Sequence, residues 1–150
     1  RVRVRDAEIL DVGGFQSELL DLACERLGAA PVRRAIGAGP AVGHAGDIVG
    51  QWSDATASHG FLLRAGVFTP INFPLATSTT AFGINDSGEI AGFYVDAGGN
   101  THGFVYSGGA FALVDVAGAR GTQLTRIKSS GVVSGVYTDA LNEQHGLIGD

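Results

Sequence analysis

The sequence has little cysteine, no methionine and few charged side chains, and two of these shortages exclude a class of protein. The single cysteine, Cys24, rules out an internal disulfide and a zinc site built on paired thiols. Charged residues make up only 17% of the chain, with 15 acidic against 10 basic ones and a net charge of −5. This balance offers no positive field to a polyanion, so we expect no nucleic acid as a partner.

Long hydrophobic runs are also missing. No stretch approaches the roughly 18 apolar residues that a transmembrane helix needs, and no basic-then-apolar leader stands at the start. We therefore expect no membrane insertion. Because the chain opens at Arg1 and contains no methionine, we also expect it to be a processed or truncated piece of a longer protein.

Glycine and apolar residues are what the chain has in abundance. The 150 residues include 24 glycines, and 45% of the chain is hydrophobic. This composition is too apolar for disorder and too rich in glycine for a helical bundle. It favours one all-β domain of short strands and tight turns.

The chain is dominated by a unit that occurs three times. In each copy a glycine-flanked apolar strand ends in an aromatic residue, an Asp follows, and a His-Gly pair opens the next strand five or six residues later. The copies are offset by 42 and then 43 residues, and they begin Gly46-Asp47-Ile48-Val49-Gly50, Gly88-Glu89-Ile90-Ala91-Gly92 and Gly131-Val132-Val133-Ser134-Gly135. A fixed period of this length predicts an architecture built from similar modules.

Each unit of about 43 residues has room for four strands, which is the size of a propeller blade. We expect repeat one at 46–87, repeat two at 88–130 and a partial repeat three at 131–150. Three units are too few for an ordinary closed propeller, so a fragment of a longer array, a homodimer that completes a ring, and a β-trefoil or three-sheet prism all remain open as alternatives.

The N-terminal third departs from the repeat. Residues 7–12 resemble 111–116, the third strand of repeat two, so we expect the strand at 1–12 to complete repeat three. Residues 13–45 form an insertion, in which 15–27 has the apolar spacing of one amphipathic helix. Residues 29–45 are rich in Ala, Gly and Pro and predict a loop.

Repeat two carries a resemblance to a known family. Its motifs resemble the bacterial HAF-type extracellular repeat, and they are Gly83-Ile84-Asn85-Asp86-Ser87-Gly88-Glu89-Ile90-Ala91-Gly92, His102-Gly103-Phe104-Val105-Tyr106 and Val114-Asp115-Val116-Ala117-Gly118-Ala119. The resemblance implies propeller-like blades, an extracellular or cell-surface location and no established activity. Repeat three departs from the pattern at Lys128-Ser129-Ser130, and 13–45 departs from it altogether.

Three histidines hold equivalent places in the three units. An Asp that closes one strand and a His that opens the next can face each other across the turn, which predicts a structural hydrogen bond. The alternative is a metal ion held by three imidazoles on a threefold axis. The pairs are Asp54 with His59, Asp96 with His102 and Asp139 with His145.

Two further sets of residues are candidates for binding. Three aromatic residues recur in register and either pack in the core or offer stacking platforms for sugar rings, with a nearby glutamine adding hydrogen bonds; they are Trp52, Tyr94 and Tyr137, with Gln51. Oxygen-rich turns offer calcium ligands at Asn85, Asp86 and Ser87 and again at 96–100, although turns favour these residues for backbone reasons too.

No Gly-x-Ser-x-Gly elbow, phosphate loop or His-Glu-x-x-His motif occurs in the sequence. We therefore expect a non-enzymatic bacterial module, extracellular or at the cell surface, that acts as a scaffold and binds a glycan or a protein surface. The alternative is a hydrolase or lyase whose active site lies at the mouth of a propeller channel.

Overall fold

A computed structural model describes residues 41–42 and 46–150 of the chain. The strand expected at 1–12 and the helix expected at 15–27 lie outside these residues. The described part is all-β and contains no helix, and it therefore has no helix that is long and apolar enough to cross a membrane. Its strands are β1 (Ala41–Val42), β2 (Ile48–Ser53), β3 (Ser58–Arg64), β4 (Val67–Ile71), β5 (Ser78–Ile84), β6 (Ile90–Val95), β7 (Thr101–Ser107), β8 (Ala110–Val114), β9 (Gly121–Ile127), β10 (Val133–Thr138) and β11 (Gln144–Gly149).

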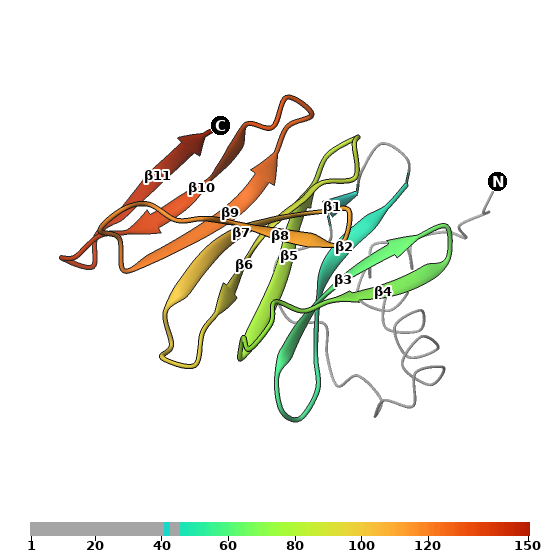
Figure 1. Ribbon diagram of the computed structural model, residues 1–150, viewed down its shortest axis with the longest axis horizontal. Helices are drawn as coiled ribbons and strands as arrows, with labels where there is room; N and C mark the ends of the chain where they lie inside the picture. Colours follow the sequence, from blue (N-terminus) through green and yellow to red (C-terminus); the bar gives the residue numbers. More distant parts are fainter. Residues whose placement is uncertain (1–40, 43–45) are drawn as a thin grey trace, which may run out of the picture.

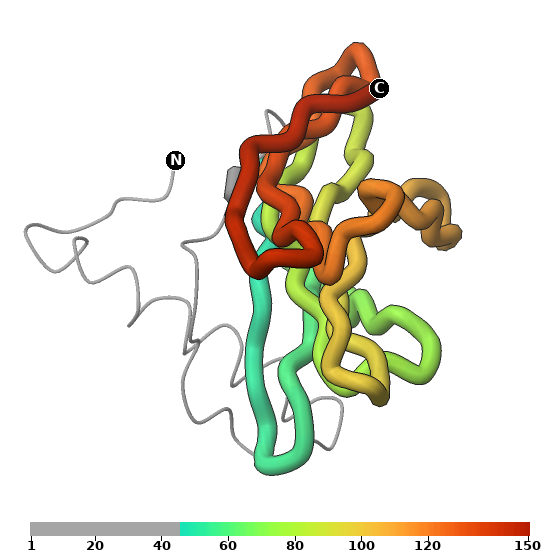
Figure 2. The backbone as a smooth tube through the Cα atoms, turned by 90° about the vertical axis from the view of Figure 1, so that its left-hand side faces the viewer, coloured from blue at the N-terminus to red at the C-terminus, as the bar shows by residue number. Residues whose placement is uncertain are grey.

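The strands form one open, mixed sheet of 11 strands, in the order β1-β2-β3-β5-β6-β7-β9-β10-β11 with β4 and β8 off this path (Figure 1). Within it lie three antiparallel meanders, β1 to β4, β5 to β8, and β9 to β11. A single parallel bridge joins each meander to the next, Ser58 with Ser78 and Thr101 with Gly121. The strands β4 and β8 pair only with β3 and β7, and Figure 2 shows the chain around them extending from the same side of the sheet.

The strands that carry the repeated pattern lie close to where the sequence predicts them in all three meanders. Apolar and β-branched runs bounded by Gly and Asp form β2, β6 and β10, and the His-Gly pairs lie one residue inside β3, β7 and β11. The strand expected at 111–116 ends two residues earlier, because β8 ends at Val114.

The prediction of loop through 29–45 is wrong at positions 41 and 42, which form β1. Pairing with β2 explains the difference, because Val42 lies opposite Ile48 in the same way that Ile84 lies opposite Ile90. The alanine-rich and glycine-rich composition hides this strand, since a strand of two residues depends on its partner rather than on its own propensity.

Apolar side chains from neighbouring meanders share two cores. The first contains Val49, Leu62, Ile71, Ala81 and Ile90, all at most 9% exposed. The second contains Ala91, Leu124, Ile127 and Val133 and joins the second meander to the third. Each core thus holds one meander against the next, as burial of their apolar faces requires.

Glycine lets strands approach each other closely inside each meander. A Cβ on Gly92 would clash with the carbonyl oxygen of Thr80, and one on Gly135 would clash with the carbonyl oxygen of Gln123. Both glycines lie beside an irregularity in the pairing of the first and second strands. These two glycines are therefore needed for steric reasons.

Candidate functional site

Three loops on one border of the sheet carry the histidines. These loops connect β2 to β3, β6 to β7 and β10 to β11, and Figure 1 shows them along the lower border. In each loop the imidazole Nε2 faces an Asp Oδ2, at 3.1 Å for His59 and Asp54, 3.4 Å for His102 and Asp96, and 2.9 Å for His145 and Asp139. We call this border the His-loop border.

An aromatic ring lies beneath each imidazole because the two are cross-strand neighbours. The pairs are Trp52 with His59, Tyr94 with His102 and Tyr137 with His145. Side chains directly opposite on antiparallel strands lie within contact distance. The rings stack with centroid separations of 4.5, 5.0 and 5.0 Å respectively.

Each Asp also organises its own loop. Asp54 Oδ1 accepts hydrogen bonds from the backbone and hydroxyl of Thr56, and Asp96 accepts from the backbone and amide of Asn100. Asp139 accepts from the backbone amides of Leu141 and Glu143. These carboxylates are therefore engaged both with the loop and with the imidazole.

The hydrogen bonds that the three Asp side chains accept stabilise the charged form of each carboxylate. Those from Thr56 hold the pKa of Asp54 well below its ordinary value, and those from Asn100 lower the pKa of Asp96 to about 2. The pKa of Asp139 is also lowered, chiefly by the hydrogen bond with His145.

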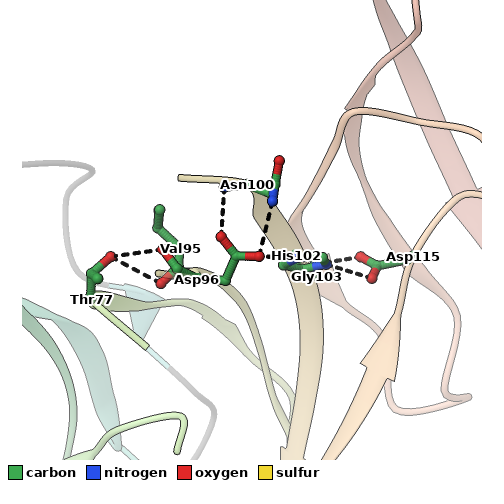
Figure 3. Close-up of polar contacts among 7 residues, drawn as sticks. All are labelled: Thr77, Val95, Asp96, Asn100, His102, Gly103 and Asp115. Carbon is green, nitrogen blue, oxygen red and sulfur yellow. Dashed lines mark hydrogen bonds and ion pairs between the residues drawn. The ribbon is translucent and has the colours of Figure 1, made fainter. Parts of the chain in front are cut away.

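A second polar side chain meets the Nδ1 atom of two imidazoles. Asp115 Oδ2 lies 2.8 Å from His102 Nδ1, and Asn72 Oδ1 lies 3.0 Å from His59 Nδ1. Figure 3 shows His102 held between Asp96 and Asp115. The hydrogen bond with Asp115 stabilises the imidazolium most, and the one with Asp96 does so less strongly. The pKa of His102 is therefore raised above 6.5.

Asn72 and Asp115 escaped the sequence analysis, although a signal for them existed. Each follows its histidine by 13 residues, directly after β4 or β8. A hairpin with this spacing returns the chain to the histidine. Asp115 Oδ1 also accepts a hydrogen bond from the amide of Gly103.

The structure does not bring the three imidazoles together, because each lies in its own hairpin with its own Asp. Among the described residues, one group of three side chains has its possible ligand atoms within 4.8 Å of one another, and it consists of Asp139, Glu143 and His145. In this group Asp139 already binds two loop amides and the imidazole.

The residues considered for ligand binding differ in exposure. Trp52 and Tyr94 are each 8% exposed, and Tyr94 is also stacked on Phe73 at 3.7 Å, whereas Tyr137 is half-buried. Gln51 accepts a hydrogen bond from the hydroxyl of Thr80, which ties β2 to β5. The edges of the imidazoles and carboxylates are thus more accessible than the two buried rings.

The oxygen-rich turn at Asn85 lies on the opposite border. The Asn85 side chain is buried, accepts hydrogen bonds from the amides of Ser87 and Glu89, and donates to the Glu89 carboxylate. It also donates to the carbonyl of Lys128 at 3.1 Å, which lies in the equivalent turn of the third meander. Asn85 therefore holds two turns together.

A scan of the chain against protein-family models gave no match, and a search of curated proteins gave none either.

Proposed function

We propose that this chain is a non-enzymatic, extracellular β-repeat module with propeller-like blades, similar to the bacterial HAF-type repeat, and that it serves as a scaffold which binds a glycan or a protein surface at the His-loop border. Support comes from the matching registers of the three meanders, in which an aromatic residue, Trp52, Tyr94 or Tyr137, lies directly opposite the histidine.

One observation carries the proposal, namely that the polar groups of each loop bind one another. The Asp carboxylate, the imidazole and the loop amides form closed sets of hydrogen bonds, shown for the second loop in Figure 3. Side chains that bond to one another in this way hold the loop in a fixed shape, and their outer edges are left to contact a partner. Such pre-formed polar edges suit recognition by hydrogen bonds.

The exposure of the loops fits the same role. The side chains of His102 and His145 are 29% and 40% exposed, and those of Asp96 and Asp115 are 35% and 38% exposed. An alanine follows the Asp in each loop and is exposed, at positions Ala55, Ala97 and Ala140. A partner that spans the border would contact all three loops.

A glycan array and a titration with the glycans it selects would test the proposal. The triple variant Ala55→Arg, Ala97→Arg, Ala140→Arg adds bulk at exposed positions and should abolish binding to glycan or protein ligands. A control places arginine at two exposed positions on the other border, Ser107 at the end of β7 and Ser130 in the turn between β9 and β10. Binding that survives the triple variant, or turnover of a bound glycan into cleaved products, would contradict the proposal.

A further inference from the structure

The outer edge of β11 differs from its two counterparts. In the first two meanders a fourth strand covers the third, since β4 pairs with β3 and β8 pairs with β7. Among the described residues, β11 pairs only with β10. An uncovered strand edge presents unpaired amides and carbonyls and is a site for strand addition.

The glycine of the His-Gly pair indicates that a strand should lie along the outer edge of β11. A Cβ on Gly60 would stand 2.8 Å from the carbonyl oxygen of Ile71, and one on Gly103 would stand 2.5 Å from that of Val114. Both oxygens belong to the fourth strand. Gly146 has the same place in β11, yet nothing described lies within 4 Å of its Cβ position. A fourth strand beside β11 would explain why position 146 is a glycine, because its carbonyl oxygen would leave no room for a Cβ.

The hydrogen-bond partners of the histidine also indicate a fourth strand beside β11. In the first two meanders, Nδ1 of the imidazole meets Asn72 or Asp115, each directly after the fourth strand. For His145 the described residues supply a partner at Nε2 alone, which is Asp139. The missing partner is a carboxylate or carboxamide one position beyond an added strand.

The segment 7–12 matches these requirements. Its sequence Ala7-Glu8-Ile9-Leu10-Asp11-Val12 resembles Phe111-Ala112-Leu113-Val114-Asp115-Val116, with an Asp at the place of Asp115. We propose that residues 7–12 of the same chain pair antiparallel with β11 as its fourth strand and that Asp11 binds His145. This proposal does not depend on what the His-loop border binds.

The register follows from β7 and β8. Because Gly103 lies opposite Val114 and Val105 opposite Ala112, Leu10 would lie opposite Gly146 and Glu8 opposite Ile148. The segment 13–40, which connects the proposed strand to β1, reaches about 90 Å when extended and about 70 Å if 15–27 is helical. The path of strands from β1 to β11 is roughly 40 Å at about 4.8 Å per strand.

A pair of engineered cysteines tests the register in the full chain. In a Cys24→Ala background, Glu8→Cys with Ile148→Cys should form an intrachain disulfide under mild oxidation, because the two side chains would lie directly opposite. Ile148 is 81% exposed, so its replacement costs little packing. The control, Ile9→Cys with Ile148→Cys, places the side chains on opposite faces and should stay reduced. Mass spectrometry of the oxidised monomer would show for each of the two variants whether the disulfide has formed.

Each other outcome overturns the proposal. An interchain disulfide would mean that a second copy supplies the strand, and two free thiols would mean that 7–12 does not pair with β11. A second variant avoids reliance on oxidation. Gly146→Ala should lower the urea midpoint, because its Cβ would meet the backbone of the added strand, and a midpoint equal to that of the wild type would contradict the inference.

Discussion

Asp115 shows how one side chain can distinguish otherwise similar sites. In the first meander the neutral amide of Asn72 meets Nδ1 of the imidazole, whereas in the second meander a carboxylate meets it. The carboxylate stabilises the imidazolium, so the three His loops are alike in geometry and differ in electrostatics.

Replacement of Asp115 by Asn should therefore lower the pKa of His102 towards 6.5, because the carboxylate is the largest cause of its rise. Titration of the His102 ring signals by NMR would measure the change. Asp86→Asn is a suitable control, because Asp86 lies in the turn after β5 and its carboxylate accepts a hydrogen bond from Ser129 in the turn after β9. A His102 pKa equal to that of the wild type would show that Asp115 does not act as described.

Asn85 should contribute to stability through its buried amide. Asn85→Ala removes four hydrogen bonds of this side chain and leaves the amides of Ser87 and Glu89 without their acceptor. We expect a loss of about 1–3 kcal/mol in the free energy of unfolding, measured by urea denaturation. Ser129→Ala, in the exposed turn next to it, should change stability by less than about 0.5 kcal/mol. Equal effects of the two variants would contradict this role.

At the scale of the strand, glycine fixes how closely the first and second strands of a meander approach. The clashes expected at Gly92 and Gly135 are with backbone oxygens, which cannot move without breaking the pairing. We expect Gly92→Ala and Gly135→Ala each to destabilise the fold by roughly 2 kcal/mol or more, measured by chemical denaturation.

The control for these two variants is Gly149→Ala in β11. A Cβ there would lie 4.0 Å from the nearest atom, Val133 Cγ2, which is an ordinary contact. Its midpoint should stay near that of the wild type. If Gly92→Ala were as mild as Gly149→Ala, the close approach of β5 and β6 would not be needed for folding.

Much of the strand pattern could be predicted from the sequence, because it depends on local signals. Alternating apolar runs, turn glycines and the spacing from Asp54 to His59 are all close in the chain. Contacts across longer separations could not be predicted in this way. Gln51 binds Thr80 across 29 residues and Asn85 reaches Lys128 across 43, and both depend on how the meanders pack.

The whole molecule should have a pH optimum of stability set by these groups. Folding raises the pKa of His102 above 6.5, so its contribution is complete below pH 6.5 and is lost as the pH rises through the folded value. Folding lowers the pKa of Asp54, Asp96 and Asp139 below 3.8, so their contribution is complete above that pH and is lost as it falls.

We therefore expect the urea midpoint to be highest between about pH 4 and pH 6.5. A series of denaturation curves across this range would measure the profile. Asp115→Asn should flatten the decline on the alkaline side, because it removes the largest cause of the raised pKa of His102. A midpoint that rises steadily from pH 5 to pH 8 would contradict the assignment of these groups.

The central claim is that a β unit occurs three times and that the third copy is completed by a strand from residues 7–12. Amide hydrogen exchange at Gly146, followed by NMR, tests it most directly. In the second meander the amide of Gly103 donates to Asp115, so the amide of Gly146 should donate to Asp11 and be protected to a similar degree. Exchange at Gly146 as fast as in the exposed loop at Ala140 would contradict the account.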